Sequence, residues 1–267
     1  MKPENKKKNR NPKLRKAIFR GAYVLIFAGV CFCGYKYFHA ISEYKASSEL
    51  YEGMSAFVSD ASPSAAPEST AAPEPTAAQA PITVDWDSLR SVNDEVIGWI
   101  YCEGTVINYP VAKGDDNTYY LKHLFNGDSN TCGTVFMDCA NDAELGDRNT
   151  VLYGHNMRDG SMFHSITGYQ DQAYYDEYPV MYFLTPWGNY RVDLFSAHDS
   201  WLDTTGYNVS FSSDDDYAAF LSELVSESDF TADVTPTVND KILTLSTCAY
   251  SYNNERYVVH GILTPIG

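Results

Sequence analysis

The sequence predicts a mainly β protein, a closed eight-stranded barrel with short flanking helices. Eight short runs rich in β-branched, aliphatic and aromatic residues follow one another between residues 97 and 263. Gly, Asn, Asp and Ser clusters separate these runs at close spacing. Many short strands with turn signals between them are typical of a closed barrel, here with an antiparallel or mixed sheet.

The expected strands share β-rich composition and are Ile97–Tyr101, Thr105–Ala112, Gly133–Asp138, Thr150–His155, Val180–Thr185, Tyr190–Ala197, Ile242–Thr247 and Tyr257–Leu263. A short helix is expected over Asp85–Val92, with Asp85 as its N-cap. A second helix is expected from Ser213 through Val225, because an Asp-rich first turn follows a Ser cap. Its apolar residues recur at helical spacing: Tyr217, Phe220, Leu221 and Leu224.

The N-terminal region has the composition of a membrane anchor. Residues 1–20 contain nine Lys and Arg residues and a single acid, Glu4, whereas Gly21–Tyr35 carries no charge. Extended to Ile18–Phe38, the apolar run has 21 residues, enough for a helix to cross a hydrocarbon core of about 30 Å. The lysine-rich side is expected to stay in the cytoplasm, which places the rest of the chain outside the cell.

A cleaved signal peptide is the alternative, but residues 38–40 do not form a small-x-small cleavage pattern. Beyond the anchor, residues 59–80 are rich in Ala, Pro, Ser and Thr, and such a segment cannot bury a core. The expected division is therefore a basic cytoplasmic tail (1–16), a transmembrane anchor (17–40), an extracellular stalk (41–80) and a folded domain (81–267). The whole chain has a net charge of −16 although its first 20 residues are basic, so the rest of the chain is strongly acidic. Such an acidic body argues against nucleic-acid binding.

The stretch Lys241–Leu263 reads as two strands joined by the turn-forming run Ser251–Glu255. Cys248 ends the first strand and Arg256 begins the second. In a hairpin, a thiol and a permanent positive charge emerge together, and that charge lowers a thiol pKa and can bind an oxyanion. The alternative for such a pair is a buried structural cysteine and a surface arginine.

A second stretch adds a candidate acid/base. A short apolar strand that begins with Thr150, Val151 and Leu152 ends at Tyr153-Gly154, and His155 follows at once. A histidine at a strand end beside a glycine is well placed for proton transfer. No Cys-x-x-Cys or His-x-x-x-His spacing occurs in the expected folded domain, so the sequence predicts no zinc site.

Taken together, LYGHNM (Leu152–Met157), TLSTCAY (Thr244–Tyr250), Arg256 and the closing strand RYVVHGIL resemble the sortase family, specifically its class B members. The resemblance extends upstream through INYPV, NTYYL, GTVFMD and MFHSI, and covers about residues 82–265. It implies the sortase-like eight-stranded barrel with an N-terminal helical extension. Residues 81–267 are then the sortase catalytic domain.

The resemblance implies a cysteine transpeptidase. Cys248 as thiolate attacks a peptide carbonyl to give a thioacyl-enzyme. Arg256 stabilises the oxyanion, and His155 protonates the leaving amine and deprotonates the incoming one. The resemblance likewise implies no metal and no organic cofactor. The implied location is a Gram-positive-type cell membrane, crossed once, with the catalytic domain outside.

The substrate also follows from the resemblance. It is a surface protein with a C-terminal sorting motif of the Asn-Pro-x-Thr-x type, cleaved after Thr and joined to an amine of a peptidoglycan precursor. Positions that match the family suggest a groove lined by Asn117, Leu121, Tyr153, Tyr207 and Ser246. Ala249 follows the cysteine where some relatives carry an acid, so contacts from this position differ.

Three other interpretations differ in chemistry or in acceptor. L,D-transpeptidases share the Cys/His chemistry. Their sequence pattern has an Arg two residues after the cysteine, whereas this chain has Tyr250 at that position. A non-catalytic, membrane-tethered binding module would explain the anchor, but not a cysteine, histidine and arginine at strand ends. A pilus-polymerising sortase would use the same three residues with a Lys side chain as acceptor, and the sequence leaves that alternative open.

Overall fold

The computed structural model describes residues 12–61, 79–201, 205–248 and 255–267. The expectations for the start of the basic tail, for most of the Pro-rich stalk, for Ala249 and for the turn after it lie outside these residues. The chain divides into two compact units, Met1–Ala46 and Ser47–Gly267, which are described separately below.

A single helix, α1 (Pro12–Met54), accounts for the described part of the first unit. It contains the uncharged run of the sequence, whose large apolar side chains are exposed, Leu25 and Phe27 among them. Within the described residues, the stretch Phe19–Phe57 is long and apolar enough to cross a membrane. This agrees with a single N-terminal membrane span.

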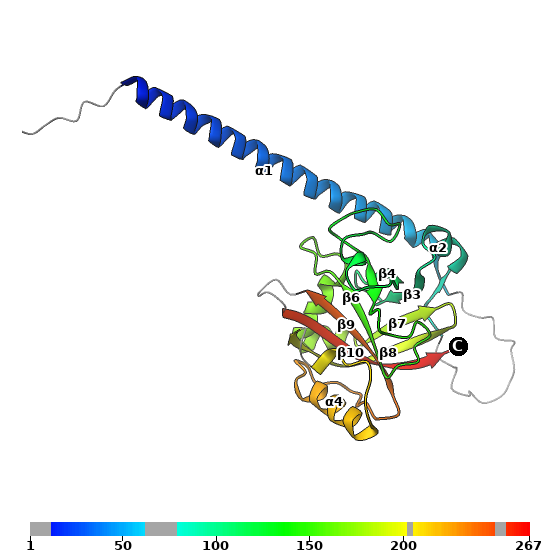
Figure 1. Cartoon of the computed structure of the whole chain (residues 1–267). Coiled ribbons are helices and arrows are strands. Elements are labelled where there is room, and N and C mark those ends of the chain that lie inside the picture. Colours follow the sequence, from blue (N-terminus) through cyan, green and yellow to red (C-terminus); the bar gives the residue numbers. More distant parts are fainter. Residues whose placement is uncertain (1–11, 62–78, 202–204, 249–254) are drawn as a thin grey trace, which may run out of the picture. The chain divides into compact units, whose positions relative to one another are not determined.

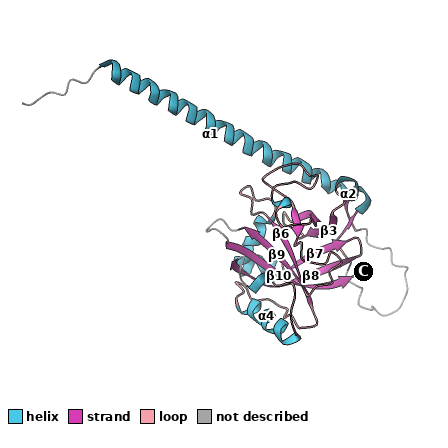
Figure 2. Cartoon of the chain, in the orientation of Figure 1, coloured by secondary structure: helices cyan, strands magenta, loops and turns pink. Residues whose placement is uncertain are grey.

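The second unit is built on a closed barrel of eight strands in the order β10-β8-β7-β3-β4-β5-β6-β9 (Figures 1 and 2). These strands are β3 (Val96–Tyr101), β4 (Asn108–Ala112), β5 (Val135–Met137), β6 (Asn149–Gly154), β7 (Val180–Thr185), β8 (Gly188–Trp201), β9 (Lys241–Cys248) and β10 (Glu255–Ile266). The pairs β4–β5 and β6–β9 are parallel, and the other six are antiparallel. The eight predicted strands are confirmed, and the sheet is mixed.

Short helical elements flank the barrel. They are η1 (Ser55–Phe57), α2 (Trp86–Val92), η2 (Tyr119–Leu121), η3 (Phe163–Gln170), α3 (Gln172–Glu177), η4 (Thr205–Tyr207) and α4 (Asp214–Ser226). α2 begins where the sequence predicts, because the Asp85 carboxylate accepts a hydrogen bond from Ser88 N at 3.1 Å. In the same way, Ser213 Oγ accepts from Asp216 N at 3.1 Å and caps α4.

The predicted apolar face of α4 covers the barrel beside β8 and β9 (Figure 1). Tyr217, Phe220, Leu221 and Leu224 pack with Phe195 of β8 and Ile242 of β9. All six residues from Ile242 to Thr247 are consequently buried. A strand covered on both faces has a continuous run of buried residues and not an alternating one, which explains the composition of β9.

The start of the folded unit differs from the boundary expected at residue 81. The last turns of α1 belong to the second unit, where Tyr51 is 9% exposed and Met54 is 2% exposed. After η1, β1 (Val58–Asp60) pairs antiparallel with β2 (Ile82–Val84). Composition shows that residues 62–78 cannot form a core, but it does not show where their two ends lie.

Those two ends are adjacent. Ala61 N donates to Pro81 O at 2.9 Å, and Asp60 pairs with Ile82. Ala61 and Pro81 therefore lie side by side on the body. In the described part of the expected stalk, residues 41–61 are almost entirely helix and strand.

We expect a chain shortened to begin at Pro81 to be markedly less stable than one shortened to begin at Ser47. The shorter chain loses the burial of Tyr51 and Met54 and the pairing of β1. Deleting one large buried side chain typically costs about 2–5 kcal/mol of unfolding free energy. Urea unfolding of both chains measures the difference, and equal midpoints would contradict the placement of the boundary.

Deletion of residues 62–78 is the matched control. Because β1 and β2 pair on both sides of the deletion, replacing the segment with a short Asn-Gly turn should change the unfolding free energy by about 1 kcal/mol or less, as expected when only loop length changes.

Two buried histidines lie inside the barrel wall. His198 of β8 and His260 of β10 stack with ring centroids 5.3 Å apart. Burial lowers the pKa of His260 well below its ordinary value, and the neighbouring His198 lowers it further. Burial likewise lowers the pKa of His198, although nearby Glu227 opposes the shift. Both imidazoles are therefore held neutral in the folded protein.

This predicts acid lability with a definite sign. Below the ordinary histidine pKa of about 6.5, the unfolded chain binds more protons than the folded one, so the unfolding free energy falls as the pH falls. In His260→Asn, the difference in unfolding free energy between pH 7.5 and pH 5 should be smaller than in the parent. His164→Asn, at an exposed position, should leave that difference unchanged. An unchanged difference in His260→Asn would refute the assignment.

Candidate functional site

Three predicted residues meet at one edge of the barrel because of how their strands pair. β6 and β9 run parallel, and their last paired residues are Gly154 and Thr247. The next residues are His155, which directly follows β6, and Cys248, which is the last residue of β9, so both lie at the carboxyl ends of neighbouring strands. On the other side of β9, Arg256 of β10 is paired with Cys248. The structure describes Cys248 by its backbone.

His155 is held by two hydrogen bonds to neighbouring backbone. Its Nε2 lies 2.8 Å from the carbonyl oxygen of Leu121, and its own carbonyl accepts from Phe163 N at 2.9 Å. A carbonyl can only accept, so Nε2 carries a proton, and in the neutral ring Nδ1 is left as the basic nitrogen. Gly154 permits this packing, since a Cβ there would lie 2.6 Å from the Phe163 ring.

A pocket of about 270 Å³ opens beside these strand ends. Eight residues line it: Asn117, Leu121, Phe136, Tyr153, Gly154, Ser246, Thr247 and Arg256. Four of the five residues expected in a substrate groove are in this set. The fifth, Tyr207, is adjacent, because its hydroxyl lies 2.9 Å from Ser246 Oγ and its ring stacks 6.2 Å from that of Tyr153. Sequence reasoning did not single out Phe136, Gly154 or Thr247 as parts of such a pocket.

Two of the lining residues, Asn117 and Tyr153, are held by Asp138, to which the sequence analysis gave no role. Its Oδ2 accepts hydrogen bonds from Tyr153 Oη at 2.7 Å and from Asn117 Nδ2 at 3.0 Å. Asn117 Oδ1 in turn accepts from Cys139 N at 2.8 Å. Burial raises the pKa of Tyr153, and the bonded Asp138 carboxylate raises it further, so Tyr153 stays a neutral donor. Only the position of Asp138 at the end of the GTVFMD run could have indicated it.

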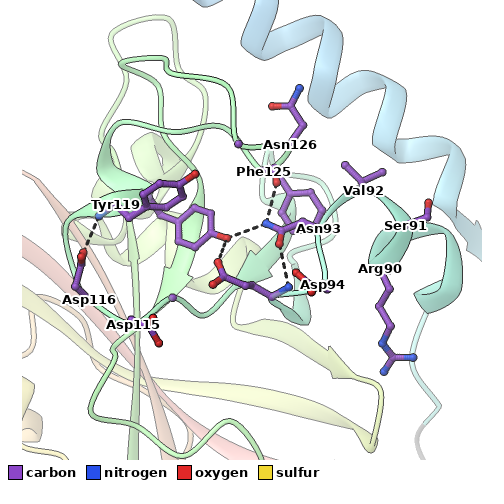
Figure 3. A pocket seen from close by; sticks show the side chains of 14 residues that line it. Arg90, Ser91, Val92, Asn93, Asp94, Asp115, Asp116, Tyr119, Phe125 and Asn126 are labelled. Atoms are coloured by element: carbon purple, nitrogen blue, oxygen red, sulfur yellow. Dashed lines mark hydrogen bonds between the residues drawn. The ribbon is translucent and has the colours of Figure 1, made fainter.

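A larger pocket, of about 610 Å³, lies between the end of α2 and residues 114–127 (Figure 3). The Glu95 carboxylate accepts from the Tyr120 hydroxyl, which also accepts from Asn93 Nδ2 at 2.8 Å. Its walls carry further carboxylates, including Asp94 and Asp115, but none of its lining residues is a cysteine or a histidine. Despite its size, this pocket therefore lacks the thiol and the imidazole of a Cys/His pair.

Among the described residues, no group of three His, Cys, Asp or Glu side chains is arranged to hold a metal ion. Cys102 and Cys132 are buried cysteines, and Cys139 is a half-buried one. Burial raises the pKa of Cys102, which suppresses its thiolate form.

Comparison with known proteins agrees with this geometry. The family model of the sortase domain matches residues 100–264. Sortase B of Staphylococcus aureus is 37% identical over 176 residues, which are 65% of this chain and 72% of the relative. The chain belongs to the sortase family, in class B. Sortase B of Listeria monocytogenes is 33% identical over 177 residues, 66% of this chain and 72% of the relative.

Solved structures of class B sortases share the fold. The crystal structure of S. aureus sortase B superposes with a TM-score of 0.66 at 35% identity, covering 69% of this chain and 88% of that one. A sortase B–substrate complex and a complex with triglycine, both of sortase B, give the same score and identity, with 68% and 86% coverage. This class B sortase is a cysteine transpeptidase with the closed mixed barrel of its relatives.

We expect Asp138→Ala to destabilise this sortase by about 1–3 kcal/mol, because it leaves the Tyr153 hydroxyl and the Asn117 amide without their acceptor in a partly buried place. Asp115→Ala, an exposed carboxylate in the larger pocket, is the control and should change the unfolding free energy by less than about 0.5 kcal/mol. Urea unfolding measures both, and equal values would show that Asp138 does not organise the pocket.

Proposed function

We propose that Cys248 is the nucleophile of this transpeptidase, that His155 is its general acid and base, and that Arg256 stabilises the oxyanion. The observation that supports this most is the strand pairing, which brings the three backbone positions to one edge of the sheet beside a pocket. Cys102 and Cys132 are buried, and burial raises the pKa of the Cys102 thiol, so neither matches an accessible nucleophile.

In the first half-reaction, the Cys248 thiolate attacks the carbonyl carbon of the motif's Thr in the bound peptide. The C–N bond of that peptide then breaks, and protonated His155 gives its proton to the departing amine. The product is a thioester between Cys248 and the N-terminal part of the substrate. His155 is left neutral, with Nε2–H directed at Leu121 O.

In the second half-reaction, an incoming amine attacks the thioester carbonyl. Neutral His155 accepts the proton that this amine loses, a new amide bond forms, and the Cys248 thiolate leaves. Water can attack the same thioester, in which case the enzyme acts as a thiol protease. The acceptor amine must therefore reach the thioester faster than water does.

Arg256 is suited to the oxyanion role by position and by charge. Its side chain lines the pocket and is half-buried, so it is partly shielded from solvent. Within the described part of the chain, no ion pair occupies its guanidinium. A guanidinium keeps its charge at all physiological pH values and donates in a fixed planar geometry. It therefore stabilises each tetrahedral intermediate without itself changing protonation.

The proposed substrate is a surface protein with an Asn-Pro-x-Thr-x sorting motif, bound where Asn117, Leu121, Tyr153 and Ser246 line the pocket and Tyr207 braces it. The proposed acceptor is an amine of a peptidoglycan precursor. The sortase B complexes with substrate and with triglycine support both classes of partner. No metal or organic cofactor takes part in the proposed reaction.

The proposed location is the cell membrane of a Gram-positive-type envelope. The apolar part of α1 would cross the bilayer once, with the basic residues 1–16 in the cytoplasm. The barrel would then lie outside, which is where sorting motifs and wall precursors meet. The excess of Lys and Arg before the apolar run supports this orientation.

Cys248→Ala should abolish ligation of an Asn-Pro-x-Thr-x peptide to triglycine. Mass spectrometry of the ligated product measures the reaction. Arg256→Lys should lower kcat/KM by about tenfold or more, because it keeps the charge and loses the planar donor pair; removal of an oxyanion donor typically costs about 10²–10³.

Cys139→Ala is the matched control, since this half-buried thiol lies near the pocket and has no proposed role. It should keep the parental rate. If Cys248→Ala retained ligation, or if Arg256→Lys matched the parent, the corresponding role would be lost.

A further inference from the structure

Tyr51, in the last turns of α1, is buried against the barrel. The Tyr51 hydroxyl donates to Gly133 O at 2.7 Å and lies 3.1 Å from Thr134 Oγ1. Its ring meets Tyr109 of β4 edge-on, with centroids 5.4 Å apart. All of these residues belong to the second compact unit. From this contact, two series of contacts lead to His155.

The first of these two series of contacts supports the imidazole ring of His155. Gly133 has φ +64°, and a Cβ there would lie 3.0 Å from His155 Cδ2 and 2.5 Å from Tyr120 O. Only a glycine lets the backbone approach the ring so closely. Thr134 N also donates to Tyr120 O at 2.9 Å, the residue before the carbonyl that accepts from His155 Nε2. The segment bonded to Tyr51 therefore holds both the ring and its acceptor.

The second series of contacts supports the backbone of His155. The Tyr109 hydroxyl accepts from Met162 N at 2.9 Å. Met162 is buried and has φ +55° and ψ −130°, a conformation that costs a side-chain-bearing residue about 1–3 kcal/mol and persists only where its surroundings enforce it. The next residue, Phe163, donates to the His155 carbonyl. Asn156 and Met162 also form a bridge, which closes the loop.

We propose that Tyr51 is a positioning residue for proton transfer. The C-terminal end of α1 then supports His155 and does not only join the helix to the barrel. The inference rests on the proposed role of His155. Tyr51 is far from His155 in sequence, and its two series of contacts reach the ring from one side and the backbone from the other. Loss of the Tyr51 hydroxyl releases Gly133 and shifts the ring relative to its acceptor carbonyl.

The test uses the full-length enzyme in detergent micelles and the variant Tyr51→Phe, which removes only the hydroxyl. Tyr169→Phe is the matched control, because Tyr169 is also buried and donates to a carbonyl, Tyr178 O, at 2.7 Å. With the sorting peptide and triglycine, Tyr51→Phe should lower kcat by about tenfold with KM within about twofold, since small misplacements of reacting groups cost this much or more. Tyr169→Phe should keep both constants.

A second readout does not depend on turnover. In the Cys248→Ala background, ¹⁵N-labelled histidine reports the Nε2–H of His155, assigned by its loss in His155→Gln. This signal should shift in Tyr51→Phe and in Tyr109→Phe, but not in Tyr169→Phe. If the parent cleaves no peptide, the proposed function fails while this signal still decides the role of Tyr51. An unshifted signal in Tyr51→Phe, or a kcat equal to that of Tyr169→Phe, overturns the inference.

Discussion

The proposed site of this sortase depends on the parallel pairing of β6 with β9. Parallel neighbours end at the same edge of a sheet, so the residues that follow Gly154 and Thr247 are brought together by register alone. A slip of one residue would turn every side chain of a strand to the opposite face. Antiparallel β10 then supplies Arg256 at the start of its own strand, opposite the end of β9.

Buried polar contacts hold that register below the site. Thr244 Oγ1 of β9 donates to Asn149 Oδ1 of β6 at 2.7 Å and lies 2.9 Å from His260 Nδ1 of β10. These three side chains link the same three strands that carry Cys248, His155 and Arg256. Because an unpaired polar group is costly in a buried place, a shifted register would leave several of them unsatisfied.

The same contacts extend to the wall of the pocket. Asn149 Nδ2 donates to Asn208 O at 2.9 Å, one residue after Tyr207, whose hydroxyl meets Ser246. One side of the pocket is therefore next to the Tyr207-Asn208 segment, which is hydrogen-bonded to Asn149. On the other side, Asn117 and Tyr153 are hydrogen-bonded to Asp138. Segments far apart in the chain supply each wall, so the pocket exists only when the whole barrel is closed.

Much of this arrangement was accessible from the sequence. Strand existence follows from local composition, so all eight strands and the caps at Asp85 and Ser213 were predicted. The positions of Cys248, His155 and Arg256 at strand ends were also predicted, because turn residues mark those ends. Residues with distinctive chemistry at the end of a strand are visible in one dimension.

The remainder was decided by tertiary structure. The roles of Asp138 and Gly133 come from contacts with residues distant in sequence, and neither residue has a local signal that separates it from other turn residues. The parallel partner of β9 follows from barrel closure and not from the composition of β6. Composition also placed the boundary of the body at residue 81, whereas the structure begins it at Ser47, because pairing of β1 with β2 and burial of Tyr51 depend on surfaces that only the folded barrel provides.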